Sequence, residues 1–209
     1  MSSGYLRYPH LHGDLVTFVA GPDVWLAPAG GGRAWRLSAD AAPVSYPRFS
    51  RDGSRVAWTS WRDGQPEVYA ADADGGDAAR LTYWGDSQTR VTGWTAAGEV
   101  LAISSAGQPA LKYVRAFAVP GLSGAGAPPR LLPYGPVTDL AIEETGTALQ
   151  TAGVRGEPAY WKRYRGGRAG RLWTAPAPGG PFTRVLADLE GQLGSPMLVG
   201  GRLFFLSDH

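Results

Sequence analysis

Residues 47–82 read PRFSRDGSRVAWTSWRDGQPEVYAADADGGDAARLT. Within this segment Asp52-Gly53 predicts a tight hairpin turn, because both residues tolerate the positive φ angles that such a turn requires. Residues 55–60 then alternate between the two faces of an expected β-strand. Further turns lead into two more expected strands at 67–71 and 79–83. The segment therefore predicts one blade of four antiparallel strands.

The same arrangement recurs along the chain. An aromatic residue marks the third strand of every repeat, at spacings of 44, 48 and 56 residues: Trp25, Tyr69, Phe117 and Trp173. An arginine marks the fourth strand, at spacings of 44, 50 and 54 residues: Arg36, Arg80, Arg130 and Arg184. Because a four-stranded propeller blade takes about 40 to 50 residues, this period predicts an all-β fold, a β-propeller, rather than a helical solenoid.

The 209 residues hold four whole repeats and the first half of a fifth. The expected blades cover approximately residues 8–40, 46–85, 90–134 and 136–190, with half a blade at 194–209. Since closed propellers have about four to eight whole blades, residues 1–209 are predicted to be a partial propeller from a longer product. Uncovered blade faces and strand edges would make this piece prone to aggregation when it is expressed alone.

Composition narrows the function classes. A net charge of +2 is too mild to imply nucleic acid or a membrane surface as a partner. The absence of cysteine excludes disulfides and thiolate metal sites, and it fits a reducing compartment. The first residues lack the features of a secretory signal, and no run approaches the ~20 apolar residues of a membrane span. The expected location is therefore the cytoplasm.

Two histidines near the start are candidate metal ligands. His10 and His12 lie two residues apart, so on a strand they would share one face and could hold an ion between them. The sequence shows no third ligand beside them, and polar residues on an inner propeller strand need no metal. We therefore predict neither a metal site nor a cofactor.

A basic and aromatic insertion falls inside the fourth repeat. Residues 157–171 read EPAYWKRYRGGRAGR, and this mixture of charge and rings could grip phosphates and stack bases. A single loop of this kind is more typical of a solvated or interdomain segment. We expect no nucleic-acid binding, and the sequence leaves open whether Tyr160 to Arg171 lines a channel or packs on a neighbouring domain.

The chain resembles the tricorn protease family over essentially its whole length. The matching segments are HGDLVTFVAGPDVWL, PRFSRDGSRVAW, ARLTYWG, YWKRYRGGRAGRLW and SPMLVGGRLFFLSD. The segment WKRYRGG at 161–167, coming after three blades, is the most specific of them, because other TolB-like propellers share the blade motifs. The resemblance places the chain in the N-terminal part of a six-bladed propeller, so that about four and a half of six blades are present.

This resemblance implies that the parent protein is a cytoplasmic serine-type peptidase. It would degrade oligopeptides downstream of the proteasome, assemble as a homo-hexamer, and use the propeller as a channel and filter for substrates and products. Its remaining propeller and catalytic domains would lie beyond His209. The chain itself has no Gly-x-Ser-x-Gly segment and only three histidines, at positions 10, 12 and 209, so we expect no catalytic residue within it.

The resemblance also implies one binding residue. The family holds the C-terminal carboxylate of its substrate with arginines at the start of the third blade, and a guanidinium suits this task because it binds carboxylates through two parallel hydrogen bonds. Arg90 occupies the nearest position, in the sequence Gln88-Thr89-Arg90 where the family pattern would be Gly-Arg-Arg. The alternative is an exposed loop arginine.

Two other functions stay open at the level of the sequence. A non-catalytic TolB-like propeller would bind another protein. The propeller of a prolyl-oligopeptidase-like hydrolase would be followed by a domain with a Gly-x-Ser-x-Gly turn. The sequence beyond His209 distinguishes these functions from a tricorn-type peptidase.

Overall fold

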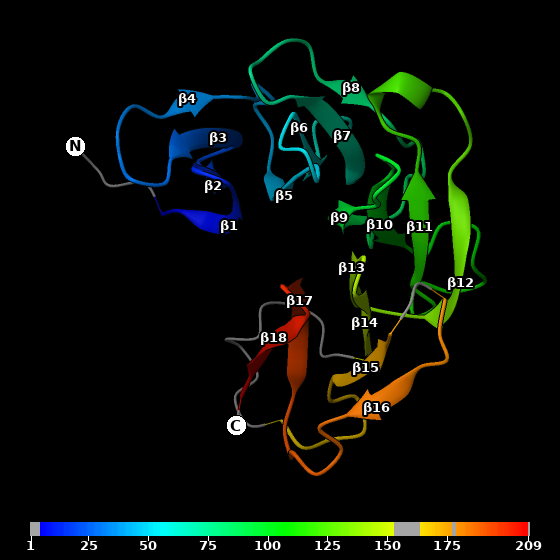
Figure 1. Cartoon of the computed structure of the whole chain (residues 1–209). Coiled ribbons are helices and arrows are strands. Elements are labelled where there is room, and N and C mark those ends of the chain that lie inside the picture. The colour runs from blue at the N-terminus through cyan, green and yellow to red at the C-terminus, as the bar shows by residue number, and fades with distance from the viewer. Residues whose placement is uncertain (1–4, 153–163, 177–178, 209) are drawn as a thin grey trace. The chain divides into compact units, whose positions relative to one another are not determined.

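The computed structural model describes residues 5–152, 164–176 and 179–208. Their regular structure is β-strand, apart from one short 3-10 helix, η1 (Leu122–Gly124) (Figure 1). No helix in this part of the chain is long and apolar enough to cross a membrane. The chain divides into two compact units: unit 1 comprises residues 1–112 and 117–131, and unit 2 comprises residues 113–116 and 132–209.

The strands form four four-stranded sheets and one two-stranded sheet. Two sheets lie wholly in unit 1: β1 (Arg7–His12), β2 (Leu15–Ala20), β3 (Asp23–Pro28) and β4 (Trp35–Arg36), then β5 (Val44–Phe49), β6 (Arg55–Ser60), β7 (Glu67–Asp72) and β8 (Ala79–Arg80). The third sheet, whose residues are divided between the units, has β9 (Arg90–Trp94), β10 (Val100–Ser104), β11 (Arg115–Val119) and β12 (Arg130–Pro136). Unit 2 holds β13 (Asp139–Glu143), β14 (Gly146–Thr151), β15 (Arg171–Ala175) and β16 (Thr183–Val185), and also the pair β17 (Leu193–Val199) and β18 (Arg202–Ser207).

The second sheet forms where the sequence predicts it. Strand β6 spans Arg55–Ser60, and the preceding turn has Gly53 at φ +74° with its amide donating to the carbonyl of Ser50 at 3.0 Å. The Asp52 carboxylate accepts hydrogen bonds from Ser50 and Ser54, and these bonds lower its pKa to about 2. Strands follow one another in sequence order across each sheet, which confirms the predicted four-stranded blades.

The recurring arginine motif of the fourth strand has a structural explanation in the first two blades. In the second blade the Thr82 hydroxyl accepts the Val68 amide at 2.9 Å and donates to the Glu67 carboxylate at 2.5 Å. Ser38 does the same with the Val24 amide and the Asp23 carboxylate, at 2.9 and 3.1 Å. These hydroxyls fasten the short outer strand to the third strand, where both acids are buried.

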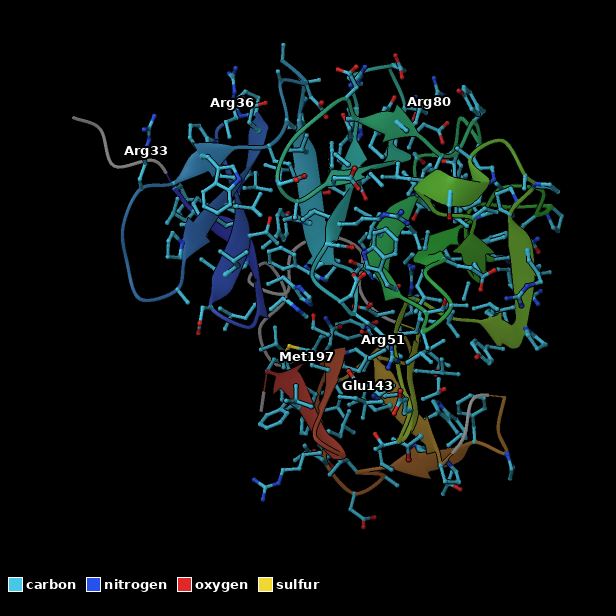
Figure 2. The ribbon with its side chains drawn as sticks, turned by 45° about the horizontal axis from the view of Figure 1, so that its top comes forward. Arg33, Arg36, Arg51, Arg80, Glu143 and Met197 are labelled. Atoms are coloured by element: carbon cyan, nitrogen blue, oxygen red, sulfur yellow. The ribbon has the colours of Figure 1, made fainter. Side chains whose placement is uncertain are left out.

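The fourth-strand arginines form ion pairs with the same buried acids. Arg80 pairs with Glu67 at 3.2 Å, and Arg36 pairs with Asp23 at 3.6 Å. Both arginines lie on the outer strands of unit 1 (Figure 2). Because a buried carboxylate needs a compensating charge and hydrogen bonds, the arginine and the hydroxyl appear together in the motif.

Two apolar clusters fill the spaces between the blades of unit 1. One joins the first and second blades and contains Trp58, which is fully buried and stacks with Tyr69 at a centroid separation of 6.4 Å. The other joins the second and third blades, and Trp84 packs against it beside Phe117. Both tryptophans therefore pack between neighbouring blades. Trp61 is partly buried and belongs to neither cluster.

Buried acids that follow the outer strands also connect neighbouring blades. Asp40 follows β4 and accepts a hydrogen bond from the Trp58 indole of the next blade at 3.1 Å. Asp86 follows β8 and accepts three hydrogen bonds of 2.6 to 2.7 Å from Ser104 and Ser105 at the end of β10. Each acid is thus bonded forward, to the blade that comes after it in the sequence.

Candidate binding surface on the first strands

The first strands of the first three blades, all in unit 1, lie beside one another. Strand β1 contacts β5, and β5 contacts β9 (Figure 1). We call the side chains of Tyr8, His10, Tyr46, Arg48 and Arg90 the first-strand surface. All five are partly buried, so each keeps some contact with solvent.

Two of these side chains are directed by an unusual backbone. Tyr8 and Tyr46 have φ angles of +54° and +52°, each immediately before a proline, and each lies in a β-bulge where the register with the second strand shifts. A bulky residue seldom adopts a positive φ angle, and a residue before proline normally prefers the extended region. A bulge redirects the side chain that it contains. The fold therefore maintains an unfavourable conformation at both tyrosines.

The redirected rings gather the cations of this surface. The ring centres of Tyr8 and Tyr46 are 4.3 Å apart. The guanidinium carbon of Arg90 lies 4.7 Å from the centre of the Tyr46 ring, and that of Arg48 lies 5.8 Å from it. Both distances are within the range of a cation–π interaction, so one ring contacts two positive charges.

The three first strands contain basic residues but no acidic ones. Strands β1, β5 and β9 read RYPHLH, VSYPRF and RVTGW, and they contain no aspartate or glutamate. Burial, with the charge of Arg48 and then that of His12, lowers the pKa of His10 to about 4, so His10 is neutral at pH 7. The Arg48 guanidinium also donates to the Pro47 carbonyl at 2.9 Å. Guanidinium groups can bind carboxylates through paired hydrogen bonds.

Comparison with known proteins places this chain in a family. Residues 3–209 match the family described as the tricorn protease N-terminal beta propeller domain. The chain belongs to the tricorn protease family. It is 54% identical over 205 residues to tricorn protease homolog 1 of Streptomyces coelicolor, and 30% identical over 207 residues to the tricorn protease homolog of Saccharolobus solfataricus. Each match covers 98% of this chain and 19% of the relative, so the chain spans about a fifth of their length.

A solved structure confirms the fold class. The crystal structure of the tricorn protease superposes with a TM-score of 0.84 at 24% sequence identity, covering 98% of this chain and 20% of that one. The predicted all-β propeller is therefore confirmed. Among the functions left open by the sequence, the family favours the tricorn type over a TolB-like or a prolyl-oligopeptidase-like propeller.

Within this tricorn-family chain, Arg90 is not the exposed loop arginine of the alternative interpretation. It is the first residue of β9, it is partly buried, and its guanidinium contacts Tyr46 from the neighbouring blade. The Val91 amide next to it donates to the Thr59 hydroxyl of the second blade at 2.9 Å. The start of the third blade is therefore fixed against the second, which holds Arg90 in place.

Sequence reasoning missed Tyr46 and Arg48, although a signal for them exists. The dipeptide Tyr-Pro occurs at 8–9 and again at 46–47, at the same place in two successive blades. A tyrosine before a proline in the middle of an expected strand is unusual enough to suggest a bulge. Arg48 could then be found as the cation next to the second of these dipeptides.

The two histidines have a structural role. The His10 Nδ1 accepts a hydrogen bond from the Phe49 amide at 3.2 Å, which joins the first blade to the second. His12 packs on the Phe49 ring at a centroid separation of 5.9 Å. In the described part of the chain, no three histidine, cysteine, aspartate or glutamate side chains gather as a metal site would require.

The basic insertion is only partly described. Residues 153–163, which include Tyr160 and the start of the WKRYRGG segment, lie outside the described residues. At its C-terminal end, the Tyr164 amide donates to the Asp208 carboxylate at 2.7 Å, and Arg165 pairs with the same carboxylate at 3.5 Å. Asp208 also accepts the Gln192 amide, so it joins the end of the insertion to the β17–β18 pair within unit 2.

Proposed function

We propose that this chain is the propeller portion of a tricorn-type serine peptidase, and that its first-strand surface binds the C-terminal carboxylate of oligopeptides. Arg90 is the binding residue of this proposal. The observation that supports it most directly is the gathering of the Arg48 and Arg90 guanidiniums on one tyrosine ring, among three strands without acidic residues. Membership of the tricorn protease family supports peptides as the substrate class of this proposal.

A free carboxylate is distinguished from an amide by its charge. The test measures the affinity of the full-length protein for a short N-terminally labelled peptide and for the same peptide with a C-terminal amide. We expect the free carboxylate to bind more tightly, and Arg90→Gln to reduce that preference about tenfold, because a charge-assisted pair is lost. A preference that Arg90→Gln leaves unchanged would remove Arg90 from the proposal.

The chain offers a control that removes the same charge elsewhere. Arg33 is exposed and lies between β3 and β4 of the first blade, away from the first strands (Figure 2). Arg33→Gln should keep the preference for the free carboxylate. If both variants lost it equally, the effect would come from net charge and not from a defined site.

The rest of the proposal concerns the parent protein. It is a cytoplasmic homo-hexamer in which the propeller filters and channels peptides released by the proteasome, while domains outside these 209 residues cut them. The full-length gene product should digest such peptides, lose activity with a fluorophosphonate that labels one serine, and show the mass of six copies in native mass spectrometry. A full-length product without peptidase activity would leave the propeller as a binding module only.

A further inference from the structure

The first residue of the third strand carries a charge in each of the four-stranded blades. These residues are Asp23, Glu67, Arg115 and Arg171. The two acids bind the hydroxyls and arginines of their outer strands, as described above. The Arg171 guanidinium donates to the carbonyls of Gly170 and Gly191 at 3.1 and 3.2 Å. Three of the four charges therefore have partners within the fold.

Arg115 differs from the other three. Its side chain is partly buried, and its Nε atom is buried without a hydrogen-bond partner among the described residues. Within the same part of the chain, Arg115 forms no ion pair. A buried donor without an acceptor destabilises a fold, and a charge without a counter-charge does so more strongly. The third blade thus has an acceptor missing at a place where the other blades supply one.

The sequence around Arg115 offers no counter-charge. Residues 100–138, which include β10, β11 and β12, contain three cations, Lys112, Arg115 and Arg130, and no aspartate or glutamate. Arg130 pairs with Glu99, just before this segment, at 3.1 Å. This sheet therefore uses its nearest acid for another arginine.

The backbone holds Arg115 in place. The Val137 amide donates to the Val114 carbonyl at 3.0 Å, which fastens the start of β11 to the chain that follows β12. Val114 and Ala116, on either side of Arg115, are both buried. The guanidinium is thus carried by a fixed part of the sheet and not by a loop.

We propose that Arg115 binds a carboxylate that the described residues do not supply. A guanidinium pairs with a carboxylate through two parallel hydrogen bonds, and one positive charge balances one negative charge. Two sources fit this chemistry: a free carboxylate ligand, and an acidic side chain elsewhere in the full-length protein. The inference goes beyond the proposed function, because Arg115 lies on a third strand and takes no part in the first-strand surface.

The test follows backbone hydrogen exchange in the full-length protein at neutral pH, in chloride and in acetate of equal ionic strength. Arg115→Met keeps an apolar stem and removes the guanidinium. Where a carboxylate is bound, this change should speed exchange over residues 113–119 about tenfold, because charge-assisted hydrogen bonds are lost. Where none is bound, removing an unpaired buried donor should leave exchange unchanged or slow it. Wild-type exchange over β6 shows that the variant is folded.

Acetate distinguishes the two sources. Wild-type exchange over residues 113–119 that slows when acetate replaces chloride, with no such change in Arg115→Met, would assign the site to a free carboxylate ligand. Wild-type exchange that acetate does not alter, with faster exchange in Arg115→Met in both salts, would assign it to an acidic side chain of the full-length protein. Exchange in Arg115→Met that equals the wild type or is slower in both salts would overturn the site.

Two further variants complete the comparison. Arg171→Met removes the same charge from the same strand position of the fourth blade, where the partners are carbonyls of the chain itself. It should keep the wild-type behaviour of residues 113–119, and a loss equal to that in Arg115→Met would assign the effect to net charge and overturn the site. Arg115→Lys keeps the charge but not the paired donors, so its exchange rate should be intermediate. It takes the place of Arg115→Met if that variant does not fold.

Discussion

The indole nitrogen of Trp94 donates a hydrogen bond of 2.9 Å to the backbone carbonyl of Arg48. Trp94 ends the first strand of the third blade, and Arg48 lies on the first strand of the second. The bond therefore connects the two blades whose arginines meet on Tyr46. It fixes the strand that carries Arg48, and so links the stability of the blade interface to the geometry of the first-strand surface.

Trp94→Phe should weaken this interface. Trp94 is 4% exposed, and the substitution removes the only polar atom of its side chain while keeping most of its apolar surface. The partner carbonyl loses a hydrogen bond in a partly buried place, so we expect a loss of about 1 to 2 kcal/mol in unfolding free energy. Urea denaturation of the full-length protein measures it. Trp84→Phe, in the same apolar cluster, is the matched control and should cost less.

Thr82→Val should destabilise the second blade although the two side chains have nearly the same shape. The Thr82 hydroxyl bonds both the Val68 amide and the buried Glu67 carboxylate. Removing it leaves both groups with one partner fewer, at a cost of about 2 to 3 kcal/mol. Thr82→Ser keeps the hydroxyl, and its denaturation midpoint should lie near that of the wild type. Equal midpoints for Val and Ser would show that the hydroxyl contributes nothing.

Gly53→Ala should cost more than an ordinary glycine substitution. Gly53 has φ +74°, and a Cβ there would also collide with the His12 ring. Gly21 is a suitable control, because its φ is +61° and a Cβ would meet nothing within 4 Å. We expect about 1 kcal/mol for Gly21→Ala from backbone strain alone, and a clearly larger loss for Gly53→Ala. Comparable thermal midpoints in the two variants would contradict the contact with His12.

Stability should fall as the pH decreases from about 6.5 to about 4. The pKa of His10 is lowered to about 4 in the folded protein, so over this interval the unfolded chain binds a proton that the folded protein does not. The stabilisation is present above pH 6.5 and is lost toward pH 4, with a total of at most about 3 kcal/mol. His10→Asn keeps an acceptor for the Phe49 amide, and its stability should vary less across this range.

The local features of the fold could be predicted, because they depend on neighbouring residues. The turn at Asp52-Gly53 and the strand at 55–60 follow from short-range preferences, and the spacing of the fourth-strand arginines follows from the length of a blade. The pairing of Tyr46 with Arg90 could not be predicted in this way. The recurring Tyr-Pro dipeptide hints at the bulge, but the approach of two strands 44 residues apart, which brings Arg90 to the Tyr46 ring, leaves no local pattern in the sequence.

The forward bonds of Asp40 and Asp86 suggest how such a chain tolerates evolutionary rearrangement. Each acid belongs to one repeat and finds its donors in the next, at Trp58 in one case and at Ser104 and Ser105 in the other. A blade moved to a new position would thus need an acid after its outer strand. It would also need hydrogen-bond donors for the acid of the blade before it. Chimeras in which each acid keeps its donors in the following blade should fold and function. Chimeras that preserve only the apolar contacts between two blades would bury a carboxylate without its hydrogen-bond donors.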